Sequence, residues 1–241
     1  MEKSIAIIPA RGGSKRIPKK NIKDFCGKPI IAYSIGAALE SGVFEEVMVS
    51  TDSEEIAEIA KKYGARVPFF RSSQMADDYA TTAQVVMEVL EEYKKLGREF
   101  DYVFCLYPTA PFTTPELIRD AVKIMDTYKP DEVIAVVEFS YPPQRCYSMD
   151  ENGFISYKYK EYIDTRSQDL EKLYHDAGQF YIYNVKPFYM RNGRIEDGIM
   201  PIILSPMSVQ DIDTEEDWLI AEAKYKLWVE KEGKKDGQRD S

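Results

Sequence analysis

The 241-residue chain has 44% apolar and 30% charged side chains, which is typical of a globular protein, and its length suits one α/β unit. Its net charge of −9 argues against a general binder of nucleic acid or anionic membranes, because such proteins are usually basic. No apolar run approaches the ~20 residues that span a bilayer, and the run Ile5–Ile8 is too short for a signal peptide, so we expect a cytoplasmic protein. Three widely spaced cysteines and a single histidine, His175, argue against a disulfide framework and a zinc cluster.

Strands and helices alternate through the first half of the chain. Short apolar runs predict strands at Ser4–Pro9, Glu46–Ser50, Arg66–Phe70, Asp101–Tyr107 and Glu132–Glu138. Helical spacing and capping signals predict helices at Pro29–Ser41, from the capping sequence Thr51–Glu54 to Gly64, at Thr81–Leu96, and from Thr114-Pro115 onward. This alternation predicts a three-layer α/β fold, with a mostly parallel sheet covered by helices on both faces.

After residue 138 the alternation stops. Two short strands at Arg145–Met149 and Phe154–Lys158 flank the turn Asp150–Gly153 and predict a β-hairpin. Residues 139–175 are therefore interpreted as an excursion from a core formed by residues 1–138 and 176–232. Residues 233–241 are expected to form a flexible tail. The core is predicted to resume with two strands and a last helix, at Gln179–Val185, Ile199–Leu204 and Thr214–Glu230.

The loop after the first strand combines glycine with positive charge. Ligands of α/β sheets bind beyond the carboxyl ends of strands, and Gly12 and Gly13 let the backbone offer N–H groups to an oxyanion. Five cations lie within ten residues of this acidic chain: Arg11, Lys15, Arg16, Lys19 and Lys20. The loop predicts a triphosphate site that stabilises the charge of departing pyrophosphate, and the alternative is a solvated basic loop. The P-loop and dinucleotide-binding patterns are absent, which disfavours a P-loop ATPase and a dinucleotide oxidoreductase.

Asp211 and Asp213 lie two residues apart between the last predicted strand and the last helix. In an extended segment, such residues point to the same side. Two carboxylates without a thiol or imidazole suit a hard cation such as Mg²⁺. The alternative is that one aspartate only caps the last helix, although Thr214 would serve that purpose equally well.

The basic loop Ala10–Asn21 resembles the signature of cytidylyltransferases that activate nine-carbon acidic sugars, the CMP-sialic acid synthetases and their relatives. Similar motifs follow in the family's order, so that the resemblance spans residues 4–230: Val49–Ser53, Arg71 with Ala76–Thr82, Leu106–Pro111 and Asp211–Thr214. The chain departs from the sialic acid branch at Tyr107 and at Ala177. Thr165–Leu170 and Tyr174–Tyr181 instead resemble the pseudaminic acid branch.

The resemblance implies a Rossmann-like, GT-A-like nucleotidyltransferase fold and the transfer of CMP from CTP to an acidic sugar, with pseudaminic acid as the first choice. It implies Mg²⁺, with Mn²⁺ as a substitute, on Asp211 and Asp213, and catalytic roles for Arg11, Lys20 and Asp211. The nucleotide-binding residues implied are Ala10, Arg11, Gly12, Gly13, Ser14, Lys15, Lys20, Asn21, Arg71, Thr81 and Thr82.

The sugar is expected to contact Tyr107, Arg166, Gln168, Phe180 and Tyr181. Phe180 and Tyr181 point to opposite faces of a strand, so only one of them is expected to line the pocket. The excursion resembles the family's dimerisation insert, which implies a homodimer in which Arg166 and Gln168 act on the partner's site.

Two other residues near these motifs are given structural roles. The lone His175 is interpreted as a hydrogen-bonded structural residue and kept as a weak candidate for the sugar site. Asp52 is interpreted as a helix cap.

Three alternatives fit parts of the pattern. One is the same reaction on N-acetylneuraminic acid, legionaminic acid or Kdo. The second is a nucleotide-binding relative that has lost catalysis, against which the intact Arg11, Lys20 and aspartate pair argue. The third is a glycosyltransferase with a related sheet, but such enzymes usually carry their Asp-x-Asp pair in the middle of the domain.

Overall fold

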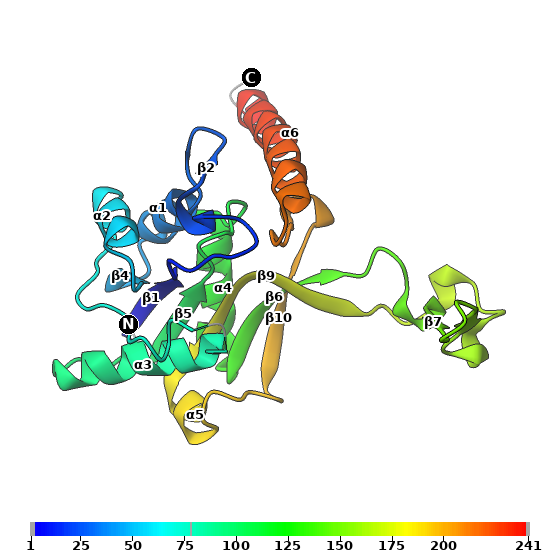
Figure 1. Ribbon diagram of the computed structural model, residues 1–241, viewed down its shortest axis with the longest axis horizontal. Helices are drawn as coiled ribbons and strands as arrows, with labels where there is room; N and C mark the ends of the chain where they lie inside the picture. The colour runs from blue at the N-terminus through cyan, green and yellow to red at the C-terminus, as the bar shows by residue number, and fades with distance from the viewer. Residues whose placement is uncertain (1–2, 78, 240–241) are drawn as a thin grey trace.

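The computed structural model describes residues 3–77 and 79–239. A six-stranded sheet lies at its centre, with the strand order β10-β6-β9-β5-β1-β4 (Figure 1). The strands are β1 (Ser4–Pro9), β4 (Glu46–Ser50), β5 (Tyr102–Leu106), β6 (Glu132–Glu138), β9 (Tyr174–Asn184) and β10 (Ile199–Leu204). All pair in parallel except β9, which runs antiparallel to β5 and β6. The predicted mostly parallel sheet is confirmed, and its carboxyl ends meet at one edge.

Helices cover both faces of this sheet, as the sequence predicts. One face packs against α1 (Ile31–Ser41), α2 (Glu54–Lys62) and α4 (Pro115–Tyr128). The other packs against α3 (Thr82–Lys95) and α5 (Val185–Met190). The last helix, α6 (Glu215–Arg239), begins against the small hairpin of β2 (Asp24–Phe25) and β3 (Lys28–Pro29). No helix within the described ranges has an apolar stretch long enough to cross a membrane.

The alternation of side chains along the strands builds two cores. On β5, Phe104 and Leu106 face α1 and α4, whereas Val103 and Cys105 face α3. All four are at most 1% exposed. Burial of apolar area at roughly 25 cal/mol per Å² on both faces is the main stabilisation of this sheet. The sheet edge that carries the basic loop is therefore held by packed cores on both faces of the sheet.

Two local predictions are corrected. Ser53, not Thr51 or Asp52, caps α2, because the Ser53 hydroxyl accepts from the Ile56 N–H at 3.4 Å. Residues 66–70 form no strand and make only one bridge, between Met48 and Arg66. Pro68 has no N–H to offer to a ladder, which explains why pairing stops there. By contrast, the predicted cap of α4 at Thr114 is present, and Thr81 caps α3.

The excursion and the last helix differ from the sequence expectation in their extent. The hairpin of β7 (Tyr147–Met149) and β8 (Ile155–Tyr157) is present and stands apart from the central sheet (Figure 1). β9 already begins at Tyr174, inside the segment assigned to the excursion. α6 continues to Arg239, whereas the sequence predicted an end at Glu230 and a flexible tail from residue 233.

One buried carboxyl group makes the stability of the fold depend on pH. Glu132 of β6 is 6% exposed, and burial, followed by the charge of Asp176, raises its pKa from 4.5 to about 7. The folded state therefore binds more protons than the unfolded state between these values. The contribution of Glu132 to the free energy of unfolding is therefore fully present below pH 4.5 and is lost as the pH rises through about 7.

We expect Glu132→Gln to raise the free energy of unfolding at pH 8 by up to about 3 kcal/mol and to change it little at pH 5. Urea denaturation at the two pH values measures the difference. The control is Glu138→Gln on the same strand, an exposed carboxylate paired with Lys172 at 3.0 Å. Equal effects of Glu132→Gln at both pH values would contradict a buried group that titrates near neutrality.

Candidate active site

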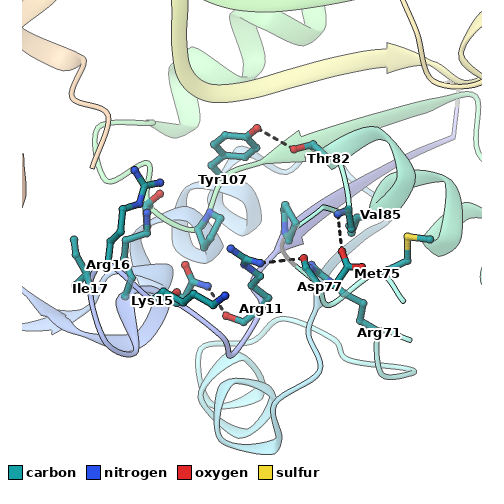
Figure 2. A pocket seen from close by; sticks show the side chains of 17 residues that line it. Arg11, Lys15, Arg16, Ile17, Arg71, Met75, Asp77, Thr82, Val85 and Tyr107 are labelled. Carbon is teal, nitrogen blue, oxygen red and sulfur yellow. Dashed lines mark hydrogen bonds between the residues drawn. The ribbon is translucent and has the colours of Figure 1, made fainter. Parts of the chain in front are cut away.

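A cavity of about 380 Å³ lies at the sheet edge where β1 and β5 end (Figure 2). It brings together side chains from three stretches of the chain, 9–21, 71–85 and 107–109. Those predicted from the sequence are Arg11, Ser14, Lys15, Lys20, Asn21, Arg71, Thr82 and Tyr107. Ala10, Gly12, Gly13 and Thr81 belong to the same segments but do not line the cavity.

The loop after β1 is held in place by its own polar groups. The Gly12 N–H donates to Asp52 Oδ1 at 2.8 Å, and Asn21 Nδ2 donates to the Arg11 carbonyl at 2.9 Å. A Cβ on Gly12 would lie 3.1 Å from the Ser53 Cβ, which explains the glycine at this position. Asp52 therefore anchors the loop rather than capping a helix, which corrects the sequence interpretation.

Five cations line the cavity, and Arg71, Arg11 and Lys15 among them are restrained to different degrees. Arg71 is 8% exposed and donates through Nε and Nη2 to the hydroxyl and carbonyl of Ser50, at 3.1 and 2.8 Å. Burial lowers the pKa of Arg71, and the negative charges of Asp52 and Glu88 partly oppose this shift. Arg11 Nη1 donates to the Asp77 carbonyl at 3.0 Å, and Figure 2 shows Lys15 beside it. The cavity floor is therefore positive although the protein as a whole is acidic.

The wall above these cations is built from hydroxyl groups. The hydroxyls of Tyr107 and Thr82 lie 3.0 Å apart (Figure 2). The Tyr107 ring meets the Tyr181 ring edge-on at 5.6 Å, and the Tyr181 hydroxyl donates to Asp176. Burial raises the pKa of both tyrosines, so they remain protonated donors at neutral pH. Thr81 is used differently, because its hydroxyl closes the capping box of α3.

Phe180 does not belong to this wall. It is fully buried on the opposite face of β9, against Phe104 at a ring distance of 4.8 Å. Assigning Phe180 to the sugar pocket is therefore wrong, because successive residues of a strand face opposite sides. Tyr181 is the member of the pair that points toward Tyr107, and its contact with a sugar stays a prediction.

The aspartate pair lies next to the basic loop. Lys20 Nζ donates to the Ile212 carbonyl at 2.7 Å, and Arg16 Nη2 donates to Asp213 Oδ1 at 2.8 Å. Desolvation, followed by the charge of Asp213, raises the pKa of Asp211, and Lys20 opposes this shift. Gly178 of β9 has φ +64°, and a Cβ there would lie 3.7 Å from the Asp211 carboxyl group. The pair thus faces the same sheet edge as the cavity.

The two residues of the excursion that are expected to contact the sugar lie outside the cavity. Arg166 and Gln168 are exposed and lie in the excursion that stands apart from the sheet (Figure 1), not among the residues that line the cavity. His175 is exposed, its Nδ1 lies 2.8 Å from the Asp176 carbonyl, and its ring contacts Phe139 at 4.8 Å. Asp78 of the quoted motif lies outside the described residues.

Sequence reasoning missed three polar groups of the site. Arg16 pairs with Asp213, the Asp77 carbonyl holds Arg11, and Asp176 Oδ1 accepts the Gly178 N–H at 2.7 Å while Oδ2 accepts from Tyr181. In the sequence, Arg16 is only one of five cations in the loop. Nothing in the sequence assigns it to an aspartate 197 positions away.

A basic cavity at the carboxyl edge of a mostly parallel α/β sheet, beside a pair of aspartates, defines a nucleotidyltransferase. The chain belongs to the cytidylyltransferase family, whose sequence model matches residues 5–212.

Three comparisons describe what the chain resembles. A pseudaminic acid cytidylyltransferase of Campylobacter jejuni is 42% identical over 93% of this chain and 97% of its own length. A CMP-N,N'-diacetyllegionaminic acid synthase of Legionella pneumophila is 38% identical over 92% of this chain and 96% of its own length. The solved structure of a CMP-2-keto-3-deoxy-manno-octonic acid synthetase complexed with CTP superposes with a TM-score of 0.67, covering 95% of this chain and 99% of that one. At 17% identity, the last comparison establishes the fold alone.

Proposed function

We propose that the protein transfers CMP from CTP to the anomeric hydroxyl of pseudaminic acid and releases pyrophosphate. The observation that carries the chemistry is the basic cavity beside Asp211 and Asp213. The 42% identity with the Campylobacter jejuni enzyme along nearly the whole chain supports the choice of sugar. The same reaction on a legionaminic acid is the second candidate, supported by the 38% identity with the Legionella pneumophila synthase.

The reaction needs little covalent chemistry from the protein. The sugar hydroxyl oxygen forms a bond to the α-phosphorus of CTP and releases its proton to solvent, while the bond from that phosphorus to the bridging oxygen breaks and pyrophosphate takes the electron pair. Positioning and electrostatic stabilisation supply most of the acceleration of such transfers. Arg11 is proposed to stabilise charge on the transferring phosphate, and Lys15, Lys20 and Ser14 are proposed to hold the β- and γ-phosphates, because all four line the cavity.

The cytidine is proposed to bind between the loop and α3. Asn21, Arg71 and Thr82 all line the cavity there. Asn21 Nδ2 donates to the Arg11 carbonyl and the Thr81 hydroxyl closes its helix cap, so we propose that both residues shape the nucleotide site. Arg71 is proposed to recognise a polar edge of the base, and its hydrogen bonds to Ser50, which hold the guanidinium in one orientation, support this role.

The two aspartates have the donor chemistry of a divalent cation site. Their carboxylates are close enough that Asp213 raises the pKa of Asp211, and a cation between them would relieve this repulsion. Among the described residues no group of three acidic, histidine or cysteine side chains could hold a metal, so the remaining ligands are proposed to be phosphate, sugar and water oxygens. A bound Mg²⁺, or Mn²⁺ in its place, would supply Lewis-acid assistance to the attacking hydroxyl and charge neutralisation.

The sugar is proposed to lie against Tyr107 and Tyr181 and to be completed by a second subunit. The hairpin of the excursion exposes apolar side chains that a lone chain leaves in water: Tyr147 at 51%, Met149 at 71%, Phe154 at 74% and Ile155 at 59%. Such exposure at the end of a projecting arm favours a homodimer interface. In that dimer, Arg166 and Gln168 would act in trans, with Arg166 pairing with the sugar carboxylate.

The test is pyrophosphate release with Mg²⁺, each of the four nucleoside triphosphates, and a panel of pseudaminic, legionaminic and N-acetylneuraminic acids and Kdo. We expect the rate of release with CTP and pseudaminic acid to exceed that with every other pair at least tenfold. With the wrong sugar, polar groups of the pocket would lack hydrogen-bond partners. Preference for another acidic sugar would overturn the assignment of pseudaminic acid. No release with any pair, from protein that binds CTP, would overturn the enzyme assignment for this chain.

A further inference from the structure

The second aspartate of the pair is held by two cations of the N-terminal loop. Arg16 Nη2 donates to Asp213 Oδ1 at 2.8 Å, and Lys20 Nζ lies 3.4 Å from the same oxygen. Both cations also line the cavity proposed for the triphosphate. The same two side chains therefore face an expected metal ligand on one side and the expected phosphates on the other.

The two cations are restrained to different extents. The Lys20 side chain is 21% exposed and also donates to the Ile212 carbonyl at 2.7 Å, which fixes it to the segment between the aspartates. The Arg16 side chain is 67% exposed and that of Asp213 39% exposed. An ion pair between side chains as exposed as these contributes little to stability. Arg16 is thus the partner that can leave Asp213 without disturbing the fold.

Arginine on Asp213 opposes a metal ion in two ways. Its N–H occupies a lone pair of Oδ1 that a cation would use, and its positive charge repels a divalent ion. A triphosphate in the cavity offers the guanidinium several phosphate oxygens, a geometry that arginine binds well. Moving Arg16 to the phosphates would free Asp213 at the moment when phosphate oxygens arrive as further metal ligands.

We propose that Arg16 is an exchangeable counterion of Asp213 that keeps divalent metal weakly bound until a nucleoside triphosphate draws the guanidinium away. This inference rests on the metal site of the proposed function. It makes the binding of nucleotide and metal cooperative, and by thermodynamic linkage each strengthens the other by the same factor. Arg16 is accordingly a positioning residue that acts through Asp213.

The test measures Mn²⁺ affinity by electron paramagnetic resonance, without nucleotide or sugar, for the wild type, Arg16→Met and Lys19→Met. Lys19 is the matched control, because it lies in the same loop and carries the same charge but pairs with Glu55 at 2.7 Å. We expect Arg16→Met to bind Mn²⁺ about 5-fold more tightly than the wild type, and Lys19→Met to stay within about 2-fold of it. Circular dichroism checks that each variant is folded.

Equal Mn²⁺ affinities of Arg16→Met and Lys19→Met, including no detectable binding by either, would overturn the proposal. Asp213→Asn separates this failure from a failure of the metal site. Loss of Mn²⁺ binding in Asp213→Asn, with no gain in Arg16→Met, would remove the counterion role and leave the metal site intact. Unchanged Mn²⁺ binding in Asp213→Asn would remove the metal site and the counterion role together, whatever the pyrophosphate assay reports.

Discussion

Replacing Asp211 with asparagine is expected to lower kcat about 10³-fold and to leave CTP binding measured without metal nearly unchanged. The substitution keeps the shape of the side chain but removes the negative charge that a divalent cation needs. Of the two aspartates, Asp211 is the more available ligand for such an ion, because Asp213 already accepts a hydrogen bond from Arg16. The measurement is steady-state pyrophosphate release, with CTP affinity from calorimetry in the presence of a chelator.

The fold of this variant should not suffer. Because desolvation and Asp213 raise the pKa of Asp211, its charge destabilises the folded state once the pH exceeds that pKa. Asp211→Asn should therefore be at least as stable as the wild type at pH 7 in urea denaturation. Glu216→Gln is the control, since it removes a charge from an exposed position in the first turn of α6. A loss of activity in Glu216→Gln equal to that in Asp211→Asn would point to bulk charge and contradict a metal-binding role.

The elements that the sequence predicts well are those whose signals are local. Thr114 stands at a helix start where its hydroxyl finds a free backbone N–H within three residues, and it caps α4 as expected. The capping signal Thr51–Glu54 misled by two positions because Ser53, in the same stretch, competes for the same role. Asp52 is thereby left to reach across to Gly12. When neighbouring polar residues have the same local propensity to cap a helix, only contacts with distant parts of the chain decide which of them does so.

The direction of β9 is the largest feature of the fold that local reasoning could not supply. The apolar run Gln179–Val185 identifies a strand, but its direction depends on where the chain re-enters the sheet after the excursion. The re-entry is antiparallel and carries an irregularity between Ile134 and Val136 of the partner strand. Gly178, at φ +64°, lies on β9 within this stretch. The placement of Asp211 beside that glycine is therefore a property of topology, which spacing in the sequence does not contain.

Arg11 carries the second large effect, and its variants separate stabilisation of the transition state from binding of the substrate. Arg11→Met removes the guanidinium at the end of β1, and we expect kcat to fall about 10²- to 10³-fold with a much smaller change in KM for CTP. Only an interaction that is stronger in the transition state than in the ground state has this signature. Arg11→Lys should recover part of kcat, because it returns the charge without the forked geometry.

Lys15→Met provides the internal comparison, since Lys15 lines the same cavity and is proposed to hold the β- and γ-phosphates. Its loss should raise KM for CTP more than it lowers kcat, because those phosphates are bound before and during the transfer. Steady-state kinetics at saturating sugar gives both constants, and thermal unfolding checks that the loss of the Arg11–Asp77 contact has not loosened the loop. If Arg11→Met raised KM and spared kcat, Arg11 would be a binding residue. The positive charge at the transferring phosphate would then have to come from Lys15 or Lys20.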